Sequence, residues 1–294
     1  MTRTTIGRPR AIITGAAGGM GRACARRLGA TLDLVLTDAA PSLDAFVTEL
    51  RADGYTVSAA IIGDQGDPAI LRTLAAEAER GFSRLVHTAG LPPSANWRRI
   101  IEVNHVATVK LLDAVEPALA PGAAAALIAS VAGHMAPRSQ EVDAVLSAPH
   151  DPDILGRLEA AIRRTLPSRD DGAWGLLAYC LSKERIIRLC EQRATAWGMR
   201  GARIVSISPG MIFTPMGRSE AEIDESSAAL VTSTPLGRWG TAMEIAAAAD
   251  FLTGPEAAFI TGSDVKLDGG ALAMVHSRAD NTFTDVLQGR LDRA

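Results

Sequence analysis

A tyrosine and a lysine stand four residues apart in the segment Tyr179-Cys180-Leu181-Ser182-Lys183. Residues i and i+4 share one face of a helix, so the phenol and the ammonium are expected to lie side by side. A free phenol has a pKa of about 10 and is a poor acid–base group near neutral pH. A neighbouring cation stabilises the phenolate and lowers that pKa, which makes Tyr179 a candidate proton donor and acceptor.

Two polar residues elsewhere in the chain favour this interpretation. Ser130 ends the apolar run 124–129, where its hydroxyl would be placed to hydrogen-bond a carbonyl or alcohol oxygen. Asn104 falls inside a helical pattern, and because asparagine is a poor residue for a helix interior, another role is indicated. The pattern Tyr-x-x-x-Lys alone is common by chance and would then be a solvated helix face.

A glycine cluster near the N-terminus is typical of a phosphate site. The segment Thr14-Gly15-Ala16-Ala17-Gly18-Gly19-Met20-Gly21 follows an expected strand and opens an expected helix. Glycines let the backbone approach a pyrophosphate, and a helix N-terminus offers it unpaired N–H groups. A turn without a ligand is the alternative. The spacing also departs from the usual G-x-G-x-x-G, because Cys24 stands at its last position.

Two acidic residues follow the next two expected strands. Asp38 is placed to accept hydrogen bonds from the adenosine ribose, and it would repel the 2′-phosphate of NADP. Since positions 16, 17 and 39 are all alanine, no cation is expected beside such a phosphate. These features predict NAD as the cofactor. Asp64 could bond the adenine amino group. Each residue could instead only cap a turn.

The elements that would position these residues alternate along the chain. Strands are expected at 11–13, 32–37, 56–62, 85–88, 124–129, 203–207 and 265–267, and helices at 20–28, 42–53, 67–80, 97–119, 176–197 and 242–253. This alternation predicts one α/β domain over residues 1–294, a doubly wound parallel seven-stranded sheet of the Rossmann type. The carboxyl ends of its strands would form the ligand crevice.

One segment, residues 137–174, interrupts the alternation. Its central part, Gln140–Leu166, is charged, rich in alanine and bracketed by prolines. An unstructured loop of this length would be unusual inside a compact domain. A helical insertion is therefore expected before the helix that carries Tyr179.

Composition excludes several other classes. The chain of 294 residues is 47% hydrophobic and carries a net charge of -3, which does not favour a nucleic-acid or membrane partner. No apolar run is long enough to span a membrane. Cys24, Cys180 and Cys190 lack C-x-x-C spacing and are interpreted as reduced thiols of a cytoplasmic protein. The five histidines lack metal-ligand spacing, so no metal is expected.

Taken together, these residues resemble the short-chain dehydrogenase/reductase family in its compact single-domain branch. The matches occur in family order from one end of the chain to the other: Gly15, Gly19, Gly21, Asp38, Ala89, Gly90, Asn104, Ser130, Tyr179, Lys183, Pro209, Gly210 and 268–270. One departure is His87-Thr88, where the family usually has two asparagines; this puts local hydrogen bonding in the sheet in doubt. The insertion resembles that of a subgroup, the hydroxysteroid dehydrogenases/carbonyl reductases.

The resemblance implies a role for each matched residue. Tyr179 is the general acid–base, Lys183 assists it and holds the nicotinamide ribose, Ser130 orients the reacting oxygen, and Asn104 anchors a water relay. Thr214 and Ile212 would bind the nicotinamide carboxamide. The remaining residues expected around the cofactor are Gly15, Gly19, Met20, Gly21, Asp38, Asp64, Ala89, Gly90 and Pro209.

The implied reaction is hydride transfer between NAD(H) and a secondary alcohol or ketone. The segment 211–239 is expected to form a lid, and its apolar residues suit a hydrophobic cyclic or steroid-like substrate. The alternative is a non-catalytic NAD-binding regulator on the same fold. A homodimer or homotetramer is expected, with a dimer favoured because the insertion would alter one of the family's interfaces.

Overall fold

The computed structural model describes residues 8–166, 173–218, 231 and 234–277. Its main sheet has seven strands in the order β3-β2-β1-β4-β5-β6-β9, and every neighbouring pair is parallel. The strands are β1 (Arg10–Thr14), β2 (Asp33–Asp38), β3 (Val57–Ile62), β4 (Arg84–His87), β5 (Ala124–Ile128), β6 (Arg203–Pro209) and β9 (Asp264–Leu267). The strand order reverses between β1 and β4, so the ligand crevice belongs at their carboxyl ends.

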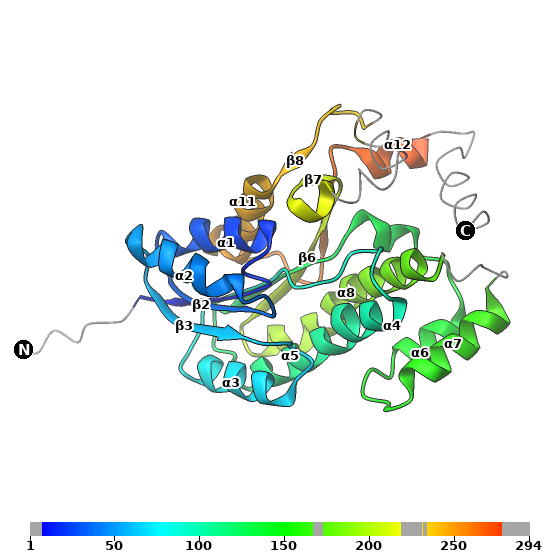
Figure 1. The fold of residues 1–294 in the computed structure, drawn as a ribbon, viewed down its shortest axis with the longest axis horizontal. Coiled ribbons are helices and arrows are strands. Elements are labelled where there is room, and N and C mark those ends of the chain that lie inside the picture. Colours follow the sequence, from blue (N-terminus) through cyan, green and yellow to red (C-terminus); the bar gives the residue numbers. More distant parts are fainter. Residues whose placement is uncertain (1–7, 167–172, 219–230, 232–233, 278–294) are drawn as a thin grey trace, which may run out of the picture.

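Helices cover both faces of this sheet (Figure 1). On one face lie α1 (Gly19–Gly29), α2 (Ser42–Ala52) and α11 (Ala242–Thr253), and on the other α3 (Pro68–Glu79), α5 (Ala107–Val115) and α8 (Trp174–Met199). Successive strand residues point to opposite faces. Ile13 of β1 therefore joins the core with α1, while Ile12 joins the core with α8. The expected doubly wound α/β sheet is confirmed.

The helix expected over 97–119 differs from the prediction. It begins as α4 (Trp97–Ile100), continues as a π-helical segment (Ile101–Val106) and becomes regular again in α5, before a 3-10 turn at Glu116–Ala118. A π-helical bulge is rare and usually marks a functional position. Here the bulge contains Asn104.

The insertion is helical, as expected. It contains α6 (Gln140–Leu146) and α7 (Ile154–Thr165), and a 3-10 turn (Val131–Met135) connects β5 to it. Residues 167–172 of the predicted range lie outside the described residues. Buried side chains of both helices pack against α4 and α8 in a third apolar cluster, which is separate from the two sheet faces.

Three short elements near the C-terminal end were not expected from the sequence. The strands β7 (Ile212–Phe213) and β8 (Gly240–Thr241) form a small parallel sheet, and α12 (Ala271–Ser277) follows β9. A two-residue strand is too short to show an alternating pattern. Much of the expected lid, at 219–230 and 232–233, lies outside the described residues.

Candidate active site

The glycines of the loop between β1 and α1 are required by close backbone contacts. Gly15 has a φ of +65°, and a Cβ built on it would lie 2.6 Å from the Ala89 nitrogen. A Cβ on Gly21 would lie 2.1 Å from the Gly15 carbonyl oxygen, and one on Gly19 would lie 2.8 Å from the Thr214 side chain. The loop can therefore fold tightly over the strand ends only without side chains. This shape fits the expected pyrophosphate cradle.

Asp38 connects the end of β2 to this loop. Its Oδ2 accepts a hydrogen bond from the Ala17 N–H at 2.9 Å, and its Oδ1 accepts one from the Ala40 N–H at 2.8 Å. The carboxylate thus caps the following turn and also braces the glycine loop. A carboxylate has about four lone-pair sites, so acceptor capacity remains for a ribose hydroxyl.

His87 and Thr88 stand where the family usually has two asparagines, and both form hydrogen bonds within the sheet region. The Thr88 hydroxyl donates to the Thr14 carbonyl at 2.8 Å, and the buried His87 ring lies between the hydroxyls of Thr14 and Thr108. Thr108 donates its one proton to the Asn104 carbonyl, so His87 must donate from Nε2 and accept at Nδ1. Burial, and secondarily Lys183, lowers the pKa of His87 to about 3, which keeps this neutral form.

Ser130, Tyr179 and Lys183 line one cleft, as the sequence predicts. Ser130 follows β5 and its Oγ accepts the Ala132 N–H, while the other two residues lie one turn apart on α8. The Lys183 ammonium lies 5.7 Å from the centre of the Tyr179 ring and donates to the Ile128 carbonyl at 2.9 Å. The expected cofactor residues in the same lining are Met20, Gly90, Pro209, Ile212 and Thr214.

Asn104 lies behind this lining. Its Oδ1 accepts the Leu91 N–H at 2.7 Å, and its Nδ2 donates to the Leu91 carbonyl and to the Ser182 hydroxyl. A Cβ on Gly90 would lie 3.3 Å from Asn104 Oδ1 and 3.5 Å from Lys183 Nζ. The amide, the glycine and the ammonium are therefore neighbours, and the relay role of Asn104 stays a prediction.

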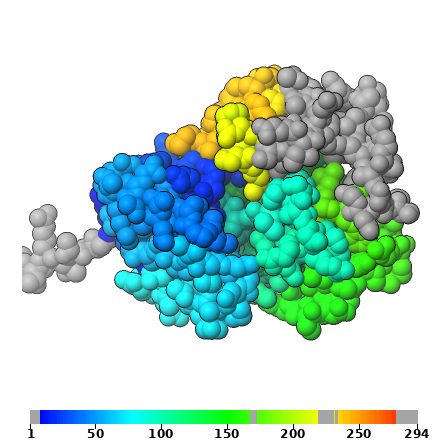
Figure 2. Space-filling view, in the orientation of Figure 1, coloured from blue at the N-terminus to red at the C-terminus, as the bar shows by residue number. Residues whose placement is uncertain are grey.

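The segment after β6 closes one side of the cleft. The Ile212 carbonyl accepts the Thr214 N–H at 2.8 Å, and the buried Thr214 hydroxyl accepts the Gly217 N–H at 3.1 Å. Because Thr214 packs against Gly19, this segment also contacts the phosphate cradle. Figure 2 shows it in yellow, between the blue N-terminal elements and the teal residues around α4.

Asp64 differs from the other predicted residues. Its Oδ1 accepts the Gly66 N–H at 2.7 Å, and its Oδ2 pairs with Arg99 at 2.7 Å. The Gly66 N–H and then Arg99 hold the pKa of Asp64 below its usual value. In the structure the Asp64 side chain therefore caps a turn, and its contact with adenine stays a prediction.

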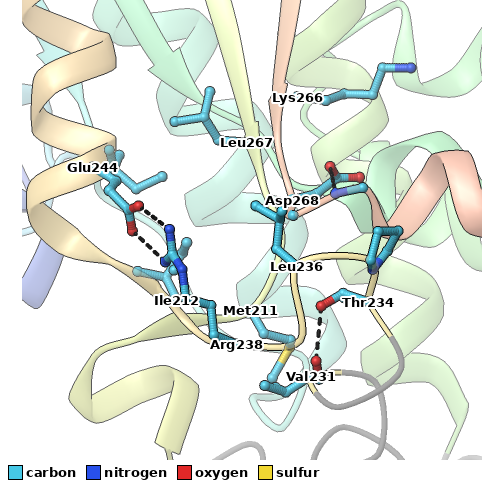
Figure 3. A pocket seen from close by; sticks show the side chains of 15 residues that line it. Met211, Ile212, Val231, Thr234, Leu236, Arg238, Glu244, Lys266, Leu267 and Asp268 are labelled. Carbon is cyan, nitrogen blue, oxygen red and sulfur yellow. Dashed lines mark hydrogen bonds and ion pairs between the residues drawn. The ribbon is translucent and has the colours of Figure 1, made fainter.

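A second, larger cavity of about 470 Å³ lies behind Met211 and Ile212 (Figure 3). The Arg238–Glu244 ion pair lies on one side of it, and the Thr234 hydroxyl donates to the Val231 carbonyl on another. Ser130, Tyr179 and Lys183 do not line it. The residues predicted for acid–base chemistry therefore lie in the smaller cleft.

Sequence reasoning missed several contributors to the site. Thr108 and Ser182 make the polar contacts that hold Asn104, and Leu91 supplies both of its backbone partners. Ser182 stands next to Lys183, but a serine in a helix carries no signal of its own. Leu91 contributes backbone atoms, which residue type does not reveal.

Two family models cover most of the chain. The model described as short chain dehydrogenase matches residues 9–142, and the one described as enoyl-(acyl carrier protein) reductase matches residues 165–271. The chain is 31% identical over 266 residues to the short-chain dehydrogenase/reductase bsc3 of Alternaria brassicicola, which covers 87% of this chain and 93% of the relative. It is 30% identical to the 3-alpha-hydroxysteroid dehydrogenase/carbonyl reductase of Comamonas testosteroni, over 90% of this chain and 96% of the relative.

A solved structure resembles the fold over nearly its full length. The 3-alpha-hydroxysteroid dehydrogenase of Pseudomonas sp. B-0831, complexed with NADH, has a TM-score of 0.71 and 26% identity, and the match covers 92% of this chain and 99% of that one. Among the described helices, none is both long and apolar enough to cross a membrane.

Proposed function

The chain belongs to the short-chain dehydrogenase/reductase family, and we propose that it transfers a hydride between NAD(H) and a secondary alcohol or ketone. The observation that carries this proposal is the joint lining of one cleft by Ser130, Tyr179 and Lys183. A non-catalytic nucleotide-binding protein would not need these three side chains together.

The cofactor site fits a dinucleotide. The loop that contains Gly15 and Gly21 has no space for a Cβ at either position, so its backbone can approach a ligand closely. This loop leads into the N-terminus of α1. Ile212 and Thr214 would hold the carboxamide, and the nicotinamide would supply or accept the hydride when bound. Asp38 favours NAD, because its carboxylate would face the 2′-phosphate of NADP.

The chain's own residues would handle the proton. In the reductive direction the Tyr179 hydroxyl donates a proton to the carbonyl oxygen as that oxygen gains electron density, and the Ser130 hydroxyl hydrogen-bonds the same oxygen. The tyrosinate left behind is stabilised by the Lys183 ammonium. The products are the alcohol and the oxidised cofactor; oxidation of an alcohol reverses each step.

The substrate that we propose is a hydrophobic cyclic or steroid-like ketone or alcohol. Apolar side chains contribute to the lining of the cleft, among them Leu91, Met211 and Met216. Two similar proteins, from Comamonas testosteroni and Pseudomonas sp. B-0831, are named for 3-alpha-hydroxysteroids. A fused apolar ring system would bury more of these side chains than a sugar would.

We also propose a symmetric homo-oligomer in the cytoplasm, with a dimer favoured over a tetramer. Strand β9 ends the strand order of the described sheet, and Phe251 and Phe259, which precede it in the chain, are exposed. An open strand edge and exposed apolar side chains suit pairing with a second copy. The buried thiols of Cys24 and Cys190 suit a reducing compartment.

The test is Tyr179→Phe, assayed by NADH oxidation with a panel of cyclic ketones. Turnover should fall by roughly 10²–10⁴, because the acid–base group is lost, while NADH binding stays close to that of the wild type. Tyr55→Phe is the matched control, since Tyr55 is the other tyrosine of the chain, and it should leave turnover unchanged. A Tyr179→Phe enzyme with more than a tenth of the wild-type rate would show that Tyr179 is not the acid.

A further inference from the structure

The insertion shares a core with the two helices that carry the acid–base residues. Val142 and Leu146 of α6 are buried in one cluster with Ile100 and Ile101, which flank the start of the π-helical segment. The same cluster includes buried residues of α8, and the half-buried Tyr179 packs against it. In Figure 1 the green helices α6 and α7 lie beside α4 and α8.

One hydrogen bond joins the insertion directly to the π-helical segment. The ring of His105 is buried, and its Nε2 lies 2.8 Å from the carbonyl oxygen of Leu146, the last residue of α6. A carbonyl can only accept, so Nε2 carries the proton. Burial lowers the pKa of His105 to about 4, and the ring is therefore neutral near pH 7. The contact satisfies a carbonyl that the end of a helix leaves without an intrahelical partner.

A second link joins the insertion to α8. The side chain of Arg185 is 5% exposed, and its guanidinium lies 3.7 Å from the Asp143 carboxylate and 3.5 Å from the Asp143 carbonyl. Arg185 stands two residues after Lys183. On α4, Arg98 forms an ion pair with Glu159 of α7. The insertion is thus attached to both helices, close to the residues that we assign to the reaction.

These contacts are next to residues of the proton relay. His105 follows Asn104 within the bulge, and Asn104 in turn bonds Leu91 and Ser182. A π-helical bulge departs from the regular i to i−4 hydrogen bonding of an α-helix, and in this bulge the side chains of His105 and Asn104 hydrogen-bond to residues outside it. The chain of contacts runs from α6 through His105 to the amide of Asn104.

We propose that the insertion positions the relay, and that His105 is the positioning residue through which α6 fixes the π-helical segment around Asn104. The inference rests on the proposed function for its kinetic test. His105 touches neither substrate nor cofactor in this scheme. It acts by keeping the Asn104 amide in place beside Gly90 and Lys183.

The kinetic test compares two substitutions of one residue. His105→Phe keeps a planar ring without a donor, whereas His105→Gln keeps a donor near the Nε2 position. We expect the Phe variant to lose about tenfold or more in kcat and the Gln variant to stay within about threefold of wild type. The affinity for NADH, measured by fluorescence titration, should be unchanged. The apparent pKa in the pH profile of kcat should move in the Phe variant only.

His150→Phe is the matched control, because His150 is exposed and pairs with Asp113. It should match wild type in every readout. The proposal is overturned if His105→Phe keeps the wild-type kcat and pH profile. It is also overturned if both His105 variants lose kcat and NADH affinity together, since that pattern indicates general loss of structure.

A crystal structure of His105→Phe separates this inference from the proposed function. If wild type reduces no ketone in the panel, the proposed function fails, and the structure alone decides the inference. If residues 101–106 become a regular α-helix and Asn104 no longer contacts Leu91, the result supports positioning by His105. An unchanged bulge overturns it, whatever the activity.

Discussion

The side of the cleft formed by the loop between β1 and α1 is shaped by close contacts between backbone atoms and braced by the Asp38 carboxylate, whereas the side formed by the π-helical segment and α8 is held by side chains that contact distant elements. In the first, Gly15 and Gly21 approach other backbone so closely that a methyl group would collide. In the second, His105 and Arg185 reach α6 across about forty residues of sequence. The first side, where we propose that the cofactor binds (the cofactor side), is therefore rigid because side chains are excluded from it. The second side, which we propose faces the substrate (the substrate side), depends on polar contacts between residues distant in sequence.

The difference has a mechanical consequence. Backbone collisions cannot be relieved by a rotamer change, so a substitution in the loop must move α1 itself. Polar contacts such as the one between His105 and Leu146 can be lost without a collision, and a neighbouring helix then gains freedom. Disruptive substitutions on the first side should weaken cofactor binding, and disruptive substitutions on the second side should reduce turnover.

Among the substitutions that test this comparison, the largest effect on cofactor binding is expected from Gly21→Ala. Its methyl group would lie 2.1 Å from the Gly15 carbonyl oxygen and 2.8 Å from the Ala16 Cα, and both are backbone atoms. Overpacking of this kind costs about 1–3 kcal/mol, and it would shift the backbone N–H groups that we propose bind the pyrophosphate. NADH affinity should fall by about tenfold or more, together with the melting temperature.

Gly18→Ala is the control from the same loop. A Cβ there meets only the Gly15 carbonyl oxygen, at 3.3 Å, and Gly18 has an ordinary φ of −76°. Its NADH affinity should stay near that of wild type. Equal losses in the two variants would mean that the loop does not depend on the specific collision at Gly21.

A smaller effect is expected from Asp38→Asn, which removes the charge and keeps an acceptor for the Ala17 or Ala40 N–H. Without the carboxylate, the 2′-phosphate of NADP is no longer repelled. The ratio of kcat/KM for NAD to that for NADP should fall by about tenfold. Asp33→Asn, at the other end of β2, should leave the ratio unchanged. A wild-type enzyme that uses both cofactors equally would contradict the NAD preference itself.

The cofactor side could be predicted from sequence because its requirements fall on residue types. Only glycine avoids a backbone collision at positions 15 and 21. Parallel strands that are buried on both faces are continuous apolar runs in the sequence, such as 34–36. The Tyr179 and Lys183 pair could be predicted because helical spacing alone puts both on one face. The strand and helix boundaries agree with the structure to within two residues in most elements.

The substrate side could not be predicted in the same way. The bulge around Asn104 has no spacing pattern of its own, since Ile101, Val106 and their neighbours also fit a regular helix. The partner of His105 is a backbone carbonyl 41 residues away, which no residue type identifies. The strands β7 and β8 pair across 26 residues of intervening sequence, so their pairing depends on tertiary structure.

The two sides also differ in the hydrogen bonding of their buried histidines. His87 has both ring nitrogens hydrogen-bonded, whereas His105 has a buried Nδ1 without a hydrogen-bond partner among the described residues. Burial lowers their pKa values to about 3 and about 4 from 6.5. As the pH falls below about 6.5 the unfolded chain binds protons that the folded chain excludes, so the free energy of unfolding should fall.

The smallest effect tests this contrast through the slope of stability against pH. Each histidine should contribute up to about 1.4 kcal/mol per pH unit between pH 6.5 and its folded pKa. In urea titrations from pH 7 to pH 5, both His87→Gln and His105→Gln should show a slope of stability against pH that is shallower than that of wild type by nearly one proton. Because the ring of His105 would gain an unpaired buried N–H on protonation, its slope contribution should persist down to about pH 4. A wild-type slope in the His105 variant would mean that the ring can be protonated in the folded protein, and the substrate side would then be more open to water than its packing indicates.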